Sequence, residues 1–254
     1  MDHGSSLRLV PGADTAVVFI HGIAGTPRHF DELLPLTALV PETYSVCNLL
    51  LPGHGGAVRD FSSSGMKQWR EYALEAVEAL CRTHSKIVLV GHSMGTLFSI
   101  EAACRWPEKI TALVLLAVPL CPRVKLSASV RMLRLCFGCL REDIATDYAL
   151  MRACGVEPTW KLWEYAGWIP GFLGLLAQIY RTGRMLQEMS TQAYVFQSAH
   201  DELVSKYSQQ LLRRNPCIDV HVLPNSGHFY YAPNDETFIR NKFIDLMDEI
   251  KKHD

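Results

Sequence analysis

The stretch Ile87-Val88-Leu89-Val90-Gly91-His92-Ser93-Met94-Gly95 decides the fold, because it predicts a strand, a sharp turn and a helix in immediate succession. Four apolar residues form the strand, and Thr96 to Arg105 has a helical pattern. A serine flanked by glycines two residues away on each side matches G-x-S-x-G, the nucleophile elbow, which holds the hydroxyl exposed on a strained turn. The alternative is a glycine-rich loop whose serine only caps the helix. The strand and helix on either side favour Ser93 as a nucleophile.

The composition is that of a globular α/β protein. The chain has 254 residues, of which 48% are hydrophobic and 20% are charged, and its formal net charge of -1 gives no general attraction to nucleic acid. No apolar run is long enough to span a membrane. The N-terminal residues 1–6 are polar, and the first apolar run, Ala16 to Ile20, is too short for a signal peptide. We therefore predict a cytoplasmic protein.

The eight cysteines are scattered along the chain. Without an export signal, most are expected to be buried, reduced thiols. Cys136 and Cys139 form a C-x-x-C pair, but a redox or zinc role requires a thioredoxin-like context or a second pair of ligands. We predict no metal and no organic cofactor, and no phosphate-binding or dinucleotide motif is present.

Short β-rich runs alternate with helical patterns along most of the chain. Continuous apolar strands separated by amphipathic helices predict a mainly parallel sheet with helices on both faces. Helices are predicted near 28–39, over 66–80 and at the C-terminus, where Ile239, Phe243, Leu246 and Ile250 share one side. The predicted strands are Ala16–Ile20, Tyr44–Leu49, Ile87–Val90, Ile110–Ala117, Gln192–Gln197 and Asp219–Leu223.

This alternation stops between residues 120 and 190, where only helical or irregular patterns occur. The segment is too apolar for a solvated linker, so we predict a helical cap inserted over the carboxyl edge of the sheet. The core domain would then comprise residues 1–119 and 191–254. Apolar and aromatic residues line most small-molecule pockets. The predicted substrate-binding residues of the cap are its large aromatic side chains, Trp160, Trp163, Trp168 and Phe172.

A serine nucleophile requires a base and a carboxylate that orients the base, and in doubly wound hydrolases the order is Ser, then Asp or Glu, then His. Asp201 follows the strand Gln192–Gln197 and is the predicted acid. The alternatives are Glu202, which is one residue farther from the strand, and a surface role for Asp201. His228 follows the next strand and precedes the last helix, so it is the predicted base.

The other histidines fit this role less well. His92 belongs to the elbow, and His200 adjoins the acid. Four further histidines are predicted to lie in packed or surface positions: His54, His84, His221 and His253.

The oxyanion hole needs two backbone N–H groups aimed at the developing charge. Met94, which follows the nucleophile, is expected to supply one amide. The other is predicted at Ile23, in the His21-Gly22-Ile23-Ala24-Gly25 loop after the first strand. Gly22 and Gly25 would let the backbone approach the substrate oxygen.

Together, these motifs resemble those of the α/β-hydrolase superfamily, and most closely those of its small bacterial carboxylesterases and monoacylglycerol lipases. The resemblance covers residues 16–119 and 192–254, and no motif of the cap contributes to it. It implies the α/β-hydrolase fold, with Ser93 as nucleophile, Asp201 as acid, His228 as base, and Ile23 and Met94 as oxyanion donors. The motifs are His21-Gly-Ile, Leu51-Pro-Gly-His-Gly55, Gly91-His-Ser-Met-Gly95, His200-Asp201 and Ser226-Gly-His228.

The leading hypothesis is a serine hydrolase acting on a small-molecule carboxylic ester with a medium-chain or aromatic acyl group. The same scaffold also supports acyltransferases and thioesterases, and a non-catalytic binding protein is the alternative of a different class. A basic stretch, Arg123 to Arg141, could contact an anionic membrane surface, with Val130, Leu133, Phe137 and Leu140 as its apolar stripe. A solvated outer face is the competing interpretation of that stretch.

Overall fold

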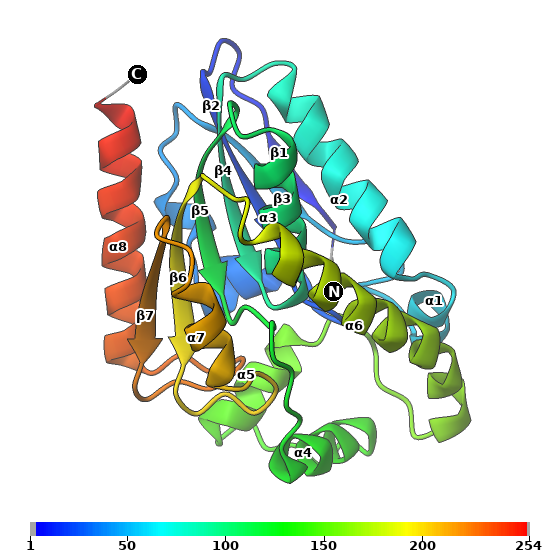
Figure 1. Cartoon of the computed structure of the whole chain (residues 1–254). Coiled ribbons are helices and arrows are strands. Elements are labelled where there is room, and N and C mark those ends of the chain that lie inside the picture. The colour runs from blue at the N-terminus through cyan, green and yellow to red at the C-terminus, as the bar shows by residue number, and fades with distance from the viewer. Residues whose placement is uncertain (1–3, 253–254) are drawn as a thin grey trace.

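A computed structural model describes residues 4–252 and has a seven-stranded sheet at its centre (Figure 1). The strand order is β1-β3-β2-β4-β5-β6-β7, with β1 antiparallel to β3 and every other neighbouring pair parallel. The predicted, mainly parallel sheet is therefore confirmed. The strands are β1 (Ser6–Arg8), β2 (Thr15–Ile20), β3 (Ser45–Leu49), β4 (Lys86–His92), β5 (Ile110–Leu116), β6 (Gln192–Ser198) and β7 (Ile218–Leu223).

Helices cover both faces of the sheet, which explains why the central strands are apolar throughout. All six residues of β2 are buried. Ala16, Val18 and Ile20 face one core, which contains residues of helices α2 (Met66–Cys81) and α3 (Met94–Arg105). Val17 and Phe19 face the other core, which includes the predicted apolar side of α8 (Pro233–Lys251). The remaining short helices outside residues 120–190 are α1 (Val58–Ser62) and α7 (Tyr207–Leu212).

The single helix predicted near 28–39 is wrong. The structure has only a five-residue helical turn at His29–Leu33 and a 3-10 turn at Thr37–Leu39. Pro35 separates them, and a proline disfavours helical backbone at the residue before it. Leu34 accordingly has φ -137° and ψ 83°.

Residues 120–190 fold into helices and contribute no strand to the sheet. Figure 1 places α4 and α5 beyond the carboxyl ends of the strands. The far half of α6 instead packs beside the sheet, where Gln178 donates a hydrogen bond of 3.1 Å to Glu101 on α3. The cap boundary at residue 190 therefore stays a prediction. The elements of this segment are α4 (Leu126–Cys136), α5 (Ala145–Ala153), a 3-10 helix (Leu162–Gly167) and α6 (Trp168–Met185).

None of the helices in residues 4–252 combines the length and the hydropathy that crossing a bilayer requires.

Candidate active site

Ser93 lies at the junction of β4 and α3, with φ 50° and ψ -118°. A positive φ is uncommon for a residue with a side chain, and it is the strain expected of a nucleophile elbow. Gly91 permits this turn, because a Cβ there would lie 2.8 Å from the Thr96 backbone on the helix. The Ser93 amide donates to the Leu116 carbonyl at the end of β5, at 2.9 Å. The close approach of Gly91 to α3 and the hydrogen bond to β5 thus both hold the turn in place.

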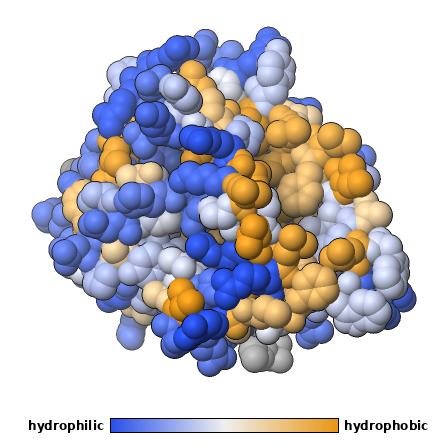
Figure 2. Space-filling model, turned by 90° about the horizontal axis from the view of Figure 1, so that it is seen from below, coloured by the Kyte–Doolittle hydropathy of each residue, from blue (hydrophilic) through white to orange (hydrophobic). Residues whose placement is uncertain are grey.

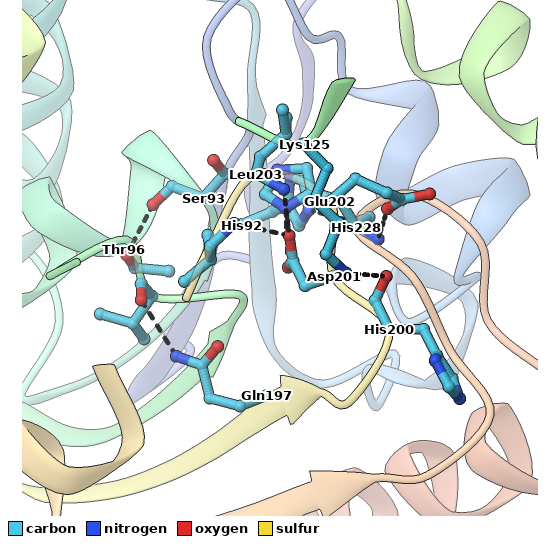
Figure 3. A network of polar contacts seen from close by, with 12 residues as sticks. His92, Ser93, Thr96, Lys125, Gln197, His200, Asp201, Glu202, Leu203 and His228 are labelled. Carbon is cyan, nitrogen blue, oxygen red and sulfur yellow. Dashed lines mark hydrogen bonds and ion pairs between the residues drawn. The ribbon is translucent and has the colours of Figure 1, made fainter. Parts of the chain in front are cut away.

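Asp201 and His228 reach the same edge of the sheet from the loops that follow β6 and β7. His228 Nδ1 lies 3.0 and 2.9 Å from the two carboxylate oxygens of Asp201 (Figure 3). The amides of Leu203 and Val204 donate to Asp201 Oδ1 at 2.7 and 2.8 Å. Both side chains of the Asp201–His228 pair are buried. The structure therefore brings the predicted acid and base into direct contact.

The charge of Asp201 is favoured despite its burial. Burial alone would raise the pKa of this carboxyl, but the nearby imidazole and the hydrogen bonds from His228, Leu203 and Val204 hold the pKa below its usual range. A carboxylate accepts hydrogen bonds only, so His228 must carry its proton on Nδ1. Nε2 is then the nitrogen that can accept a proton.

Glu202, the alternative acid, occupies a different position. Its Oε2 accepts a hydrogen bond of 3.0 Å from the His228 backbone amide rather than from the imidazole ring. Its Oε1 pairs with Arg131 of α4 at 2.9 Å. Sequence order alone could not separate the two acids, whereas their contacts in the structure do.

The loop after β2 lies against Ser93. A Cβ at Gly22 would stand 3.0 Å from the Cβ of Ser93, so a side chain there would push the loop and Ser93 apart by a few tenths of an ångström. The Ile23 amide, in this loop, and the Met94 amide, at the first position of α3, donate to no acceptor among the described residues. The positive end of the α3 dipole also favours negative charge at Met94.

Two contacts that sequence reasoning missed support the loop after β2 at Ala24, whose φ is 52°. His54 Nδ1 lies 3.1 Å from the Pro52 carbonyl, to which it must donate, so Nε2 is free to accept the Ala24 amide at 3.1 Å. On the other side, the Gly155 amide donates to the Ala24 carbonyl at 2.8 Å. Gly155 comes from the 120–190 segment and packs so closely that a Cβ would collide with the Gly25 carbonyl.

A row of buried histidines lies behind the Asp201–His228 pair. His92 Nε2 donates to the His228 carbonyl at 3.1 Å, and the ring of His29 stacks on His92 with centroids 3.9 Å apart. Burial lowers the pKa of His29 to about 3 and that of His92 well below its usual value, so both rings are neutral near pH 7. His29 Nε2 in turn lies 3.1 Å from the hydroxyl of buried Tyr231.

The other histidines that the sequence offered as bases lie elsewhere. His200 is exposed, His84 bonds the Ser45 hydroxyl at 2.9 Å, and His221 stacks on Phe196. His253 lies outside the described residues.

A cavity of about 520 Å³ opens between the sheet edge and the 120–190 segment. Its floor includes Ser93, His228 and Ile23. Arg131 and Glu202 also line it, and they pair with each other. Most of the wall from the 120–190 segment is apolar, with Val124, Ala128, Met132, Leu133, Leu150, Ala153, Trp168 and Phe172.

Only two of the four aromatic residues predicted to bind substrate face this cavity. Trp168 and Phe172 line it, from the first turns of α6. Trp160 and Trp163 do not; they pack edge to face against each other at 5.8 Å and are 62% and 66% exposed. Apolar composition placed all four in one segment but could not give the direction in which each side chain points.

The outer surface of the 120–190 segment is unusually apolar. Figure 2 shows hydrophobic side chains gathered on the end of the molecule where Figure 1 places α4 and the start of α6. In the predicted stripe, Val130, Leu133 and Phe137 are about half exposed, whereas Leu140 lies beyond the end of α4.

The C-x-x-C pair does not form a metal site. Cys139 is exposed, and Cys136 donates to the Tyr165 hydroxyl. Among residues 4–252, no His, Cys, Asp or Glu cluster is arranged to hold a metal.

The basic stretch is largely neutralised by its own neighbours. Arg131 and Arg134 both pair with the buried carboxylate of Asp147, at 3.4 and 3.3 Å. Arg141 pairs with Asp143 at 2.5 Å. The number of basic residues in the sequence therefore overstates the positive charge of this surface.

The model of the alpha/beta hydrolase family matches residues 17–240. This chain belongs to the alpha/beta hydrolase family. The match extends from β2 into α8 and includes the elbow, the Asp201 loop and the His228 loop. Both the fold and the family resemblance predicted from the motifs are confirmed.

Relatives and solved structures with this fold include esterases and lipases. A pimeloyl-[acyl-carrier protein] methyl ester esterase of Neisseria meningitidis serogroup C is 34% identical over 110 residues, which cover 42% of this chain and 38% of that protein. The chain thus matches well under half the length of that relative. Among solved structures, one from work on the metagenome-derived lipolytic enzymes LipS and LipT has a TM-score of 0.72 at 18% identity, covering 97% of this chain and 98% of that one.

A monoacylglycerol lipase of Paleococcus ferrophilus is also similar in structure. Its TM-score is 0.68 at 16% identity, with 98% of this chain and 99% of that chain covered. At such identities the similarity concerns the alpha/beta hydrolase fold, and the chemistry must be argued from the site itself.

Proposed function

We propose that this chain is a serine hydrolase that cleaves carboxylic esters through an acyl-enzyme intermediate. One observation carries the proposal. Ser93, on its strained turn, and His228, whose imidazole is held by the buried Asp201, both line the same largely apolar cavity. Serine needs a base to become nucleophilic, and the base needs an orienting carboxylate.

In the acylation step, Ser93 Oγ attacks the ester carbonyl carbon while His228 Nε2 takes the hydroxyl proton. The charge that develops on the carbonyl oxygen would be stabilised by the amides of Ile23 and Met94. The C–O bond to the alcohol then breaks, and His228 returns the proton to the departing alkoxide. Asp201 stabilises the transient imidazolium and does not itself take the proton.

In the deacylation step, a water molecule attacks the acyl carbon with His228 again acting as base. The bond to Ser93 Oγ breaks and the proton passes from His228 to the serine, which releases the carboxylic acid. The ester, one water molecule and the chain's own residues supply every atom and proton in this cycle.

The cavity supports an ester with an apolar medium-chain or aromatic acyl group. Small-molecule sites usually have volumes of about 300–1,000 Å³, and this cavity, of about 520 Å³, falls within that range. Its charged lining residues, Arg131 and Glu202, already neutralise each other, so they would not attract a charged acyl group. Trp168 and Phe172 supply the aromatic surface. In this proposal, residues 120–190 act as the cap that covers the acyl group.

Two experiments test the function. A fluorophosphonate probe should label wild-type protein at Ser93, identified by mass spectrometry of the labelled peptide, whereas a non-catalytic binding protein would stay unlabelled. A panel should then compare p-nitrophenyl esters of increasing chain length with monoacylglycerols, hydroxycinnamate esters, acyl thioesters and methyl esters, since the Neisseria relative is named for a methyl ester. Preference for thioesters, or for transfer to an added alcohol over hydrolysis, would replace the ester-hydrolase proposal with one of its alternatives.

A further inference from the structure

The beginning of the 120–190 segment is joined to the loop that carries Asp201. Pro122 and Val204 form an antiparallel bridge. On either side of it, the Arg123 amide donates to the Leu203 carbonyl at 2.7 Å and the Lys125 amide donates to the Glu202 carbonyl at 2.8 Å. The chain leading into α4 and the acid loop are therefore held together by backbone hydrogen bonds.

Glu202 adds a side-chain connection between α4 and the catalytic histidine. One oxygen of its carboxylate accepts from the His228 amide at 3.0 Å, and the other pairs with Arg131 of α4 at 2.9 Å. The side chains of Arg131 and Glu202 are 25% and 18% exposed, so solvent screens their attraction only in part. Arg131 is held in turn by Asp147 of α5, which is buried.

We propose that Glu202 is a positioning residue that couples the position of α4 over the cavity to the position of His228. Its partner on the cap is Arg131. The inference rests on the proposed function and concerns how the same site is assembled. When α4 is closed, Arg131 holds the Glu202 carboxylate where it fixes the His228 backbone. When α4 moves away, that carboxylate loses its partner and the histidine loop loses one of its supports.

The coupling has a physical reason. A base works only when it is held close to the serine proton, and a displacement of about 1 Å can reduce the rate by about 10²-fold. Asp201 orients the imidazole through Nδ1, and Glu202 holds the same residue by its amide. The two neighbouring acids therefore have separate tasks, one on the ring and one on the backbone.

Three variants separate the two halves of the link. Glu202→Ala removes both contacts. Glu202→Gln keeps an oxygen for the His228 amide but turns an NH₂ group toward Arg131, so it should break only the ion pair. Arg131→Ala breaks the same pair from the other side. The substrate is p-nitrophenyl acetate, whose acyl group is too short to depend on cap contacts.

We expect Glu202→Ala to lower kcat by about 10²-fold with little change in KM, as expected for a displaced base. Glu202→Gln and Arg131→Ala should each lower kcat by a smaller and similar factor. The double variant Arg131→Ala/Glu202→Gln should be no slower than either single variant, because both changes break one interaction. The rate of fluorophosphonate labelling should fall in parallel with kcat. Arg131→Lys should recover part of kcat, since an ammonium can still pair with Glu202.

Arg134→Ala is the matched control. Arg134 lies on the same helix and pairs with the same Asp147, but it has no contact with Glu202. It should lower the thermal midpoint about as much as Arg131→Ala does, while kcat stays at the wild-type value. A structural role alone would make both arginine variants equal in kcat.

The inference is overturned if Glu202→Ala keeps wild-type kcat and labelling rate, or if the kcat losses of Arg131→Ala and Glu202→Gln multiply in the double variant. If Glu202→Ala does not fold, Glu202→Gln and Arg131→Ala still decide the question. Wild-type protein that is neither labelled nor hydrolytic would instead contradict the proposed function, so the two failures are distinguishable.

Discussion

At the sheet edge, Ser93, Asp201 and His228 are 9%, 4% and 2% exposed, whereas Leu133 and Phe172, on the opposite wall of the same cavity, are 50% and 44% exposed. The first wall consists of loops fixed by directed hydrogen bonds, such as those that the Leu203 and Val204 amides donate to Asp201. The second wall consists mainly of apolar side chains, whose packing contacts, unlike hydrogen bonds, have no preferred direction. The difference suggests that changes on the first wall should affect the chemistry and changes on the second should affect the choice of substrate.

The largest effect is expected at the centre of the first wall. Ser93→Ala should lower ester hydrolysis by about 10⁴-fold or more while the fold stays intact, because no other group can replace the nucleophile. Steady-state kinetics with a p-nitrophenyl ester and a circular dichroism spectrum provide the measurement. Activity within about tenfold of wild type would assign the nucleophile to another residue.

Removing either of the proposed supporting residues, Asp201 or His228, should be nearly as severe. Asp201→Asn and His228→Ala should each lower kcat by about 10³-fold to 10⁴-fold, since the histidine loses its orientation or is absent. Adding either change to Ser93→Ala should have little further effect, because the three residues act as one unit. If Asp201→Asn is close to wild type while Glu202→Gln is inactive, the acid is Glu202.

His54, which supports the loop after β2 from behind the first wall, should also make stability depend on pH. Burial lowers the pKa of His54 from 6.5 to about 4, so between these values the unfolded chain binds a proton that the folded chain does not. The free energy of unfolding should therefore fall as the pH decreases through this window, by up to about 3 kcal/mol for His54 alone. Urea denaturation of wild type and His54→Phe at several pH values measures the effect. The variant should show a shallower dependence, and parallel curves would contradict the assignment to His54.

On the second wall, substitutions should change selectivity. Trp168→Ala and Phe172→Ala should raise KM for long-chain esters by about tenfold relative to acetate, because apolar burial of one such side chain contributes about 1.5–3 kcal/mol. Trp163→Ala is the matched control, since Trp163 belongs to the same segment but does not line the cavity. Equal effects on both chain lengths would mean that Trp168 and Phe172 only hold the segment together.

The smallest effect is expected at the outer surface of the second wall. Basic residues near an anionic membrane contribute about 1 kcal/mol each, screened by salt. Arg131 and Arg134 are already paired, so neutralising them should weaken vesicle binding less than Arg123→Gln, at an exposed position with no ion pair among the described residues. Co-sedimentation with anionic vesicles at low salt measures this. If wild-type protein does not bind the vesicles, this surface does not bind anionic membranes, and the substrate would be taken from solution.

The first wall could be placed from the sequence because parallel strands bring their carboxyl ends to one edge. Ser93, Asp201 and His228 each follow a recognisable strand, so their meeting at this edge could be predicted from the strand order of such folds. Their catalytic roles stay predictions. The broken helix at 28–39 could also have been predicted, because Pro35 lies within it.

The second wall could not be placed in the same way. Whether Trp168 or Trp163 faces the cavity depends on how the helices of one segment rest on distant loops, and helical periodicity does not contain that information. The same holds for His54, Glu202 and Arg131. Each makes its contact across 26 to 71 positions of sequence. His54 belongs to the motif at Leu51–Gly55, but that motif does not show which distant group the imidazole contacts.

Gly155 restricts how freely the two walls could be exchanged between proteins. Its amide holds the Ala24 carbonyl, and its position tolerates no side chain beside Gly25. A chimera that replaced residues 120–190 with the equivalent insertion of another hydrolase would therefore change the backbone beside Ile23 as well as the acyl pocket. The cap could be exchanged without disturbing the Ile23 loop only if residues 153–157 stayed with the parent core. The junctions of such a chimera therefore belong inside residues 120–190 and not at the ends of that segment.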